Sequence, residues 1–332
     1  MSERDIKGKR ILFFGLETMG YEKKILAKMR ELGAEVDYHS ERPVSSQFGK
    51  AIVKMAPSML DKRTEAYYHN IFEQRKGIRY DIVFIMKCDT PTKRVLKEIR
   101  SYFPNAELRL HMWDSLVNIP NIEEKLCLFD RITSFDRKDC EKHPELGFRP
   151  LFYIDSFTEE SNEPIAYDVS FCGTIHSDRY IVLENIRKQC EAHKMKFYGY
   201  YYMQSKLAYY YLKLIDKRFK NVPMSALKFQ TIGSEEVNRI FNASKAIVDI
   251  QHPSQTGLTM STIEALGAKK KIITTNPDIQ NYDFYNENNV CVIDRDNPIV
   301  SEEFLRTDYR QVDENVYKYY SLGQWVLDVL TM

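Results

Sequence analysis

The stretch "SQTGLTMSTIEALGAKKKIITTN", Ser254–Asn276, contains the succession of elements that decides the fold. A turn at Gly257 is followed by small hydroxyl residues, an amphipathic helix expected over Thr259–Leu266, and a short apolar run. Another apolar run, Ala246–Ile250, precedes the turn. A strand, a loop, a helix and a second strand in this order form a βαβ unit, and the two strands of such a unit run parallel.

The same alternation of strand-like and helical segments continues along both halves of the chain. Each expected helix has its apolar residues on one face, as in Glu22–Leu32. Strands are expected at Arg10–Gly15, Ala34–His39, Tyr80–Met86, Glu107–Met112, Arg131–Ser134, Arg149–Ile154, Tyr167–Gly173, Lys196–Tyr200, Ala246–Ile250 and Asn289–Ile293. The sequence therefore predicts an α/β protein with two parallel-sheet domains and a ligand in the cleft between them, at the carboxyl ends of the strands.

A change of composition marks the expected boundary between the domains. The segment "SFTEESNEPIA", residues 156–166, is polar and acidic and contains proline, which is typical of a linker. It separates an N-terminal domain at 1–155 from a C-terminal domain at 167–315. No sequence repeat relates the two domains, so their similarity lies in the pattern alone.

Composition and charge disfavour several classes of protein. The 332 residues include 48 lysines and arginines against 47 aspartates and glutamates, so no net charge favours a nucleic acid as partner. The six cysteines form no CxxC pair and are expected to be free thiols. No apolar run approaches the roughly eighteen residues of a spanning helix, and we predict a cytoplasmic protein.

The start of the helix at Thr259 is the first candidate binding site. A helix N-terminus presents unpaired N–H groups and partial positive charge, so the loop with His252 and Gly257 and the hydroxyls of Thr259 and Ser261 suit a phosphate. Glu264 follows on the same helix, and its carboxylate suits the two hydroxyl donors of a ribose. Together these features suggest a nucleoside diphosphate. The alternative is that Thr259 is an ordinary N-cap.

The stretch "SFCGTIHSDRY", Ser170–Tyr180, supplies a second junction of strand, glycine and helix. Gly173 lets the backbone approach a ligand, Thr174 offers a hydroxyl, and the forked donors of Arg179 suit a diphosphate. The alternative for Arg179 is a surface position in the first turn of a helix.

The order of the motifs resembles one family. The segments "HMWDS", "LFDRITSFDRKDCEKHPELGFRPLFYIDSF", "YDVSFCGTIHSDRYIVLENI" and "EEVNRIFNASKAIVDIQHP", followed by Ser254–Asn276, resemble the GT-B glycosyltransferases that include CgeB-like proteins and bacterial surface-polysaccharide transferases. The resemblance extends from about Arg109 to Asp294. It rests on several short motifs in order rather than on one long signature.

The resemblance implies two Rossmann-like domains that face a cleft, with the nucleotide sugar on the second domain. A UDP-type donor is favoured. The last helix, at 316–332, is then expected to pack back on the N-terminal domain. The implied donor-binding residues are Gly173, Thr174 and Arg179 near the diphosphate, Gly257, Leu258 and Thr259 around it, and Glu264 on the ribose, with His252 and Ser261 in the same loop and helix start.

Two departures from the family pattern leave the donor sugar and the stereochemical course open. Retaining GT-B enzymes often carry two glutamates eight positions apart, but the position eight before Glu264 is Thr256. CgeB-like members often have an arginine shortly before the helix glutamate, where this chain has Ser261 or Thr262.

Three carboxylates of the first domain follow expected strands and are candidates for the catalytic base. They are Glu17, Asp89 and Asp114, and each has an ordinary role as N-cap or turn residue as its alternative. We favour Asp114 because Trp113 beside it suits stacking on a sugar ring. His111 is a rival, although a histidine on an alternating strand is more often a core residue.

No metal site is predicted. The pair Asp294 and Asp296 has the spacing of a metal-binding carboxylate motif, but it follows the last expected strand and is interpreted as a solvated loop. We therefore expect metal-independent transfer, with the diphosphate stabilised by the helix start and by Arg179.

The segment Tyr200–Lys220 interleaves tyrosines with lysines and arginines. Such a helix suits peripheral contact with the inner face of a plasma membrane, where lipid-linked sugars are found. A core helix with solvated lysines and a dimer contact are the alternatives.

The function that fits these features best is transfer of a sugar from a nucleotide-diphosphate donor to a glycan or lipid-linked glycan acceptor, in building a bacterial cell-surface glycan such as capsule or lipopolysaccharide. A nucleotide-sugar 2-epimerase shares the two-domain form and is the first alternative. A non-catalytic sugar-nucleotide binding protein is the second, favoured by the missing glutamate at Thr256.

Overall fold

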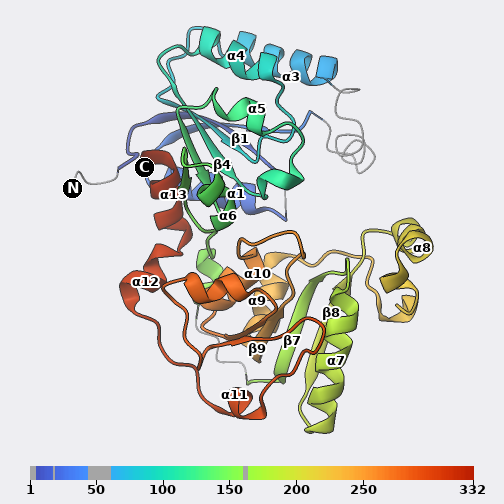
Figure 1. Cartoon of the computed structure of the whole chain (residues 1–332). Helices are drawn as coiled ribbons and strands as arrows, with labels where there is room; N and C mark the ends of the chain where they lie inside the picture. Colours follow the sequence, from blue (N-terminus) through green and yellow to red (C-terminus); the bar gives the residue numbers. More distant parts are fainter. Residues whose placement is uncertain (1–4, 18, 44–60, 160–163) are drawn as a thin grey trace. The chain divides into compact units, whose positions relative to one another are not determined.

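The computed structural model describes residues 5–17, 19–43, 61–159 and 164–332, and the chain divides into two compact units (Figure 1). The first unit comprises Met1–Pro150 together with Leu322–Met332, and the second comprises Leu151–Ser321. Each unit has its own parallel sheet with helices packed on it, so the predicted α/β class with two Rossmann-like domains is confirmed. The expected linker at 156–166 begins inside the second unit, and residues 160–163 lie outside the described part.

The sheet of the first unit has the strand order β2-β1-β3-β4-β5-β6, and every neighbouring pair is parallel. All five residues of β3 are buried, as expected for a strand that helices cover on both faces. The strands are β1 (Arg10–Gly15), β2 (Glu35–Ser40), β3 (Ile82–Met86), β4 (Glu107–Met112), β5 (Arg131–Ser134) and β6 (Leu146–Phe148). The helices between them are α1 (Tyr21–Glu31), α3 (Asp61–Gln74), α4 (Lys93–Tyr102), α5 (Glu123–Leu126) and α6 (Arg137–Lys142).

The sheet of the second unit has the order β11-β10-β9-β7-β8 and is also parallel throughout. Its strands are β7 (Tyr167–Thr174), β8 (Phe197–Tyr202), β9 (Ser244–Asp249), β10 (Lys271–Thr274) and β11 (Val290–Val292). Its helices are α7 (Arg179–Ala192), α8 (Lys206–Ile215), α9 (Ser234–Asn242), α10 (Met260–Gly267), α11 (Glu302–Arg306) and α12 (Glu314–Tyr319). No helix among the described residues has the length and apolar character needed to cross a membrane.

The prediction of a strand at Arg149–Ile154 was wrong. The last strand of the first sheet is β6, which begins three residues earlier, at Leu146. Its Gly147 pairs with Thr133 of β5. Pro150 has no N–H to donate to a ladder, so the chain leaves the sheet there. The apolar residues beyond it are buried instead in the second unit, where the Tyr153 amide donates to the Tyr320 carbonyl at 2.9 Å.

The C-terminal segment forms two helices rather than the single one expected at 316–332. Helix α12 ends at Tyr319, and α13 (Leu322–Thr331) belongs to the first unit. Asp328 of α13 forms an ion pair with Arg149, with 2.9 Å between Oδ2 and Nε and side chains that are 1% and 0% exposed. Arg109 of β4 donates to the carbonyls of Val329 and Met332 at 3.2 and 2.8 Å. The last carbonyls of a helix have no donor within the helix, and Arg109 provides one.

Trp325 of α13 packs against His111 of β4, with ring centroids 4.9 Å apart. The His111 ring is fully buried, and its Nδ1 lies 2.8 Å from the hydroxyl of Thr133. Burial, together with the nearby charge of Arg149, lowers the pKa of His111 to about 3, so the ring is neutral at physiological pH. His111 is therefore a core residue, which is the alternative that its place on an alternating strand favoured.

We expect Asp328→Asn to destabilise the first unit by about 3–5 kcal/mol, because it removes the carboxylate that pairs with the buried Arg149 guanidinium. Both tryptophans of the chain, Trp113 and Trp325, lie in this unit, so denaturant unfolding followed by tryptophan fluorescence reports on it selectively. The control is Glu35→Gln, which breaks the exposed Arg10–Glu35 pair and is expected to cost less than about 1 kcal/mol. Equal losses of unfolding free energy for the two variants would contradict the stabilising role assigned to the Arg149–Asp328 pair.

Candidate functional site

The order of strands in the second unit defines where a ligand is expected. From β7 the chain moves to β8 on one side and then returns to place β9 on the other side of β7 (Figure 1). The loops after β7 and β9 therefore diverge at the carboxyl edge of the sheet, and open α/β sheets bind ligands at such a switch point. Gly173 and Thr174 lie at the end of β7, and the loop 250–259 follows β9. The structure thus brings both predicted binding segments to one edge.

Helix α10 begins at the N-cap Thr259, whose side chain accepts from the Thr262 amide at 3.3 Å. Asp249, the last residue of β9, accepts from the hydroxyls of Thr259 and Thr262 at 2.9 and 2.6 Å. The Thr259 hydroxyl is therefore occupied as a cap. What the helix start offers to a ligand is its first backbone amides, those of Met260 and Ser261, and the partial positive charge of the helix.

Arg179 opens helix α7 and is buried, with 8% of its surface exposed. Its Nε and Nη1 donate to the carbonyls of Ile250 and Thr174, both at 2.7 Å, and Nη2 also bonds to Ile250. Burial lowers the pKa of Arg179 to about 10, which leaves it cationic at neutral pH. It is thus a buried positive charge that ties the end of β7 to the loop after β9, and not the surface arginine of the alternative interpretation.

Arg295 is a part of this edge that the sequence did not reveal. It follows β11, and its Nη1 contacts Asp178 at 2.6 Å. Its Nη2 donates to the Gln251 carbonyl at 2.8 Å and to the Thr275 hydroxyl at 3.1 Å. A single guanidinium therefore joins the loops that follow four strands, β7, β9, β10 and β11. In the sequence, only the two aspartates beside it, Asp294 and Asp296, have the pattern of a functional motif.

The remaining predicted residues lie around the same edge. The rings of His252 and His176 are 5.3 Å apart, and burial, with the charge of Arg179, lowers the pKa of His176 to about 3. Glu264 of α10 is 3% exposed. Burial, together with the carboxylates of Glu236 and Glu264, raises the pKa of the Cys172 thiol to about 12. Gly257 and Leu258 are buried, and Ser261 is half-buried.

The three candidate bases follow strands of the first unit, at the carboxyl edge of its sheet. Glu17 follows β1 and is exposed. Asp114 follows β4, is 29% exposed, and accepts from Lys87 and Asn118 at 3.1 and 2.8 Å. Trp113 beside it packs edge-on against Trp325, with centroids 6.2 Å apart. Asp114 is thus a fixed but partly accessible carboxylate.

Asp89 follows β3 and is held more tightly. It pairs with Arg42, and Lys87 lies 3.7 Å away. Although burial opposes its charge, these cations lower the pKa of Asp89 to about 2. A carboxylate of such low pKa is a weak proton acceptor.

Glu41, which sequence analysis did not identify, supports the turn that carries Asp89. Its carboxyl group is fully buried and accepts from the amides of Cys88 and Thr90 at 3.0 and 3.2 Å. Lys87 and Cys88 both have left-handed backbone, with φ of 74° and 62°, which side chains other than glycine seldom adopt. Burial and the neighbouring Asp89 raise the pKa of Glu41 well above its usual range. No signal in the sequence separates Glu41 from other glutamates that follow a strand.

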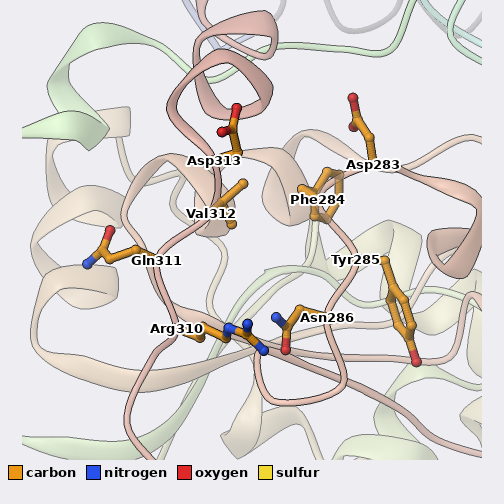
Figure 2. Close-up of a pocket in the computed structure, with 8 residues that line it drawn as sticks. All are labelled: Asp283, Phe284, Tyr285, Asn286, Arg310, Gln311, Val312 and Asp313. Carbon is orange, nitrogen blue, oxygen red and sulfur yellow. The ribbon is translucent and has the colours of Figure 1, made fainter.

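A hollow of about 220 Å³ lies elsewhere in the second unit, between the segment before β11 and the segment before α12 (Figure 2). Figure 2 shows the Arg310 guanidinium pointing toward Asn286, while the carboxylates of Asp283 and Asp313 point away from them. Asp283 accepts from the Tyr320 hydroxyl at 2.5 Å, and Asp313 caps α12. Of the lining residues, Asp283, Phe284, Tyr285 and Asn286 precede β11, whereas Arg295 follows it, so the hollow is at the opposite end of that strand from Arg295.

No group of three histidine, cysteine or acidic side chains with metal-binding geometry occurs in the described part of the chain. Asp294 accepts from the amides of Asp296 and Asn297, both at 2.8 Å, and both aspartates are exposed. Asp294 thus forms the turn that positions Arg295.

Comparisons with solved structures identify the fold. An alpha-glucosyltransferase in complex with UDP and a 13-mer DNA superposes with a TM-score of 0.62 at 15% identity, over 97% of this chain and 100% of that one. Anabaena Alr3699/HepE, in complex with UDP and glucose, gives 0.62 at 11% identity over 96% and 98%. An alpha,alpha-trehalose-phosphate synthase from Burkholderia xenovorans gives 0.64 at 10% identity over 97% and 99%. No protein-family model matches the sequence, and no related curated sequence was found. The chain therefore has the GT-B fold.

We expect Arg295→Gln to loosen the loops that Arg295 joins. The loss of charge-assisted hydrogen bonds is worth roughly 1.5–3 kcal/mol, so amides of 250–259 and 275–276 should exchange hydrogen about ten- to a hundred-fold faster. The control is Arg306→Gln, which breaks an exposed pair with Glu302 on α11. Unchanged exchange in both loops would show that Arg295 does not hold this edge together.

Proposed function

We propose that this protein is a glycosyltransferase that moves a sugar from a nucleotide-diphosphate donor, of UDP type, to a glycan acceptor. The observation that carries the proposal is the edge formed by Gly173, Arg179 and the start of α10 at the switch point of the second sheet. Such an edge combines close backbone approach, a buried cation and free helix amides, which are the elements of a diphosphate site. UDP or glucose in two structures of the same fold supports the donor class.

In the proposed donor site, the diphosphate lies on the backbone of Gly257, Leu258 and Thr259 and on the first amides of α10. Arg179 supplies positive charge and holds the two loops together, while Glu264 accepts from the ribose hydroxyls. The remaining contacts are proposed for Gly173, Thr174, His252 and Ser261.

The proposed reaction joins the acceptor oxygen to the anomeric carbon of the sugar and breaks the bond from that carbon to the diphosphate. The nucleotide leaves with the electron pair, and the acceptor hydroxyl gives its proton to a carboxylate. Asp114 is the proposed base because it is partly accessible, with Glu17 and Asp89 as the other candidates. The helix start and Arg179 are proposed to stabilise the leaving diphosphate without a metal ion.

The proposed acceptor is a cell-surface glycan or its lipid-linked precursor, such as capsule or lipopolysaccharide. A lipopolysaccharide outer core galactosyltransferase, WaaB, has the same fold, with a TM-score of 0.51 at 12% identity. The near balance of charges over the chain disfavours DNA as acceptor. We place the protein in the cytoplasm, with peripheral membrane contact through Tyr200–Lys220.

The reaction is tested by incubating the protein with UDP-glucose and UDP-N-acetylglucosamine in EDTA, with and without oligosaccharide acceptors. Release of UDP that depends on an acceptor supports transfer. Conversion of the sugar nucleotide to its 2-epimer without an acceptor would instead show an epimerase, and mass spectrometry with chromatographic separation distinguishes the two. Activity that appears only after manganese is added would contradict metal independence.

We expect Glu264→Gln to weaken UDP binding by about ten- to a hundred-fold, because a ribose hydroxyl loses a charge-assisted partner worth roughly 1.5–3 kcal/mol. Uridine should lose affinity to the same extent. Arg179→Lys should weaken UDP more than uridine, because Arg179 is assigned to the diphosphate. The control is Glu184→Gln on α7, whose carboxylate pairs with Arg187. Calorimetric titration that gives wild-type affinity for Glu264→Gln would place the donor elsewhere.

A further inference from the structure

Helix α8 is fixed to the second unit by one face only. Tyr209 on this face is 2% exposed, and its hydroxyl donates to the Val222 carbonyl at 2.9 Å. Ala208 and Leu212 pack against the apolar core of the second unit, to which Tyr209 belongs. Phe219, which follows the helix, is fully buried in the same core. The inner face therefore accounts for the folding of this helix.

The outer face of α8 is apolar and exposed. Its large side chains recur three and four positions apart, so they form one stripe along the helix. The stripe consists of Leu207, Tyr210, Tyr211, Leu214 and Ile215, which are 82%, 59%, 62%, 86% and 57% exposed. These are five of the exposed large apolar side chains of the described structure, gathered on a single ten-residue helix. Figure 1 shows α8 standing beyond the β8 edge of the sheet in this unit. A continuous apolar surface of this kind marks an interaction site.

Positive charge surrounds the stripe. Residues 206–220 include five basic side chains, Lys206, Lys213, Lys217, Arg218 and Lys220, and one acidic side chain, Asp216. Asp216 is bonded to Arg218, with 2.9 Å between Oδ1 and Nε. All four lysines are exposed. The surface therefore combines leucine and isoleucine, tyrosines with polar tips, and a net positive rim.

We infer that the outer face of α8 docks on an anionic lipid surface. Leucine and isoleucine enter the acyl boundary, tyrosines suit the headgroup level, and lysines attract anionic headgroups. A second copy of the chain fits this surface less well, because a two-fold interface would set the two basic rims against each other. This surface gives the proposed membrane contact a defined set of residues.

The docking face is close to the proposed donor edge. Helix α8 follows the carboxyl end of β8, and β8 is the neighbour of β7 in the sheet. Arg218 donates hydrogen bonds to Asp216, and these bonds, with a contribution from the charge of Asp178 in the loop after β7, raise the pKa of Arg218. Docking would therefore bring the donor edge to the membrane, where the acceptor is a membrane-anchored glycan. This assignment of the acceptor rests on the proposed function, whereas the docking itself does not.

The docking is tested by co-sedimentation of the full chain with vesicles of phosphatidylglycerol and phosphatidylethanolamine, and with vesicles of phosphatidylcholine. We expect binding to the first and little to the second, with weakening at high salt. Leu207→Ser with Leu214→Ser should reduce binding about ten-fold. Lys206→Gln, Lys213→Gln, Lys217→Gln and Lys220→Gln together should reduce it on the order of a thousand-fold, because each of the four charges is worth about 1 kcal/mol near the surface.

Controls use exposed residues of the same unit outside α8. Ile181→Ser with Ile299→Ser, and Lys188→Gln with Lys196→Gln, should leave vesicle binding unchanged. Calorimetric titration with UDP on each variant tests the donor site separately, so loss of lipid binding with intact UDP binding supports the docking face. Wild-type protein that ignores phosphatidylglycerol, or α8 variants that bind as wild type does, would overturn the inference. A dimer in sedimentation velocity that the two leucine changes abolish would overturn it in favour of a second copy.

Discussion

Every strand of both sheets runs parallel to its neighbours, and the rest of the structure depends on this constraint. Parallel strands need crossover connections, which place helices on the faces of a sheet and bury its strands from both sides. They also bring the carboxyl ends of all strands to one edge. Residues as distant in sequence as Asp178 and Arg295 thereby become neighbours, at 2.6 Å. The candidate site in each unit is a consequence of this geometry.

Each carboxyl edge also needs polar side chains that hold its loops. In the second unit Arg179 and Arg295 bond mainly to loop carbonyls and side chains, so two buried or partly buried cations stiffen the edge. In the first unit Glu41 accepts from the amides of a turn with left-handed backbone at Lys87 and Cys88. A strained turn persists only where its surroundings fix it, and such turns concentrate at functional sites. The two edges thus use opposite hydrogen-bonding groups, guanidinium donors in one and a carboxyl acceptor in the other, for the same structural task.

The sequence indicated part of the candidate site, because glycines at strand ends and a cap at a helix start are local signals. Gly173 and Thr259 were predicted in this way, and the structure places Gly173 at the end of β7 and Thr259 at the start of α10. Arg295 and Glu41 were not predicted, because their roles depend on partners 20 to 117 residues away in sequence. Helix α8 was found as an aromatic and basic segment, but only the packing of Tyr209 shows which face is free.

The sequence by itself determined the α/β alternation, the parallel sheets and the two-domain plan, because apolar periodicity and turn residues act within a few positions of one another. The tertiary structure alone decided where the last strand of the first sheet lies and how the C-terminal segment divides. Pro150 ends one ladder, and Arg149 and Asp328, 2.9 Å apart and fully buried, hold α13 in the first unit. Burial of a charge is favourable only with a partner at that distance, and no local pattern reports a partner from the other end of the chain.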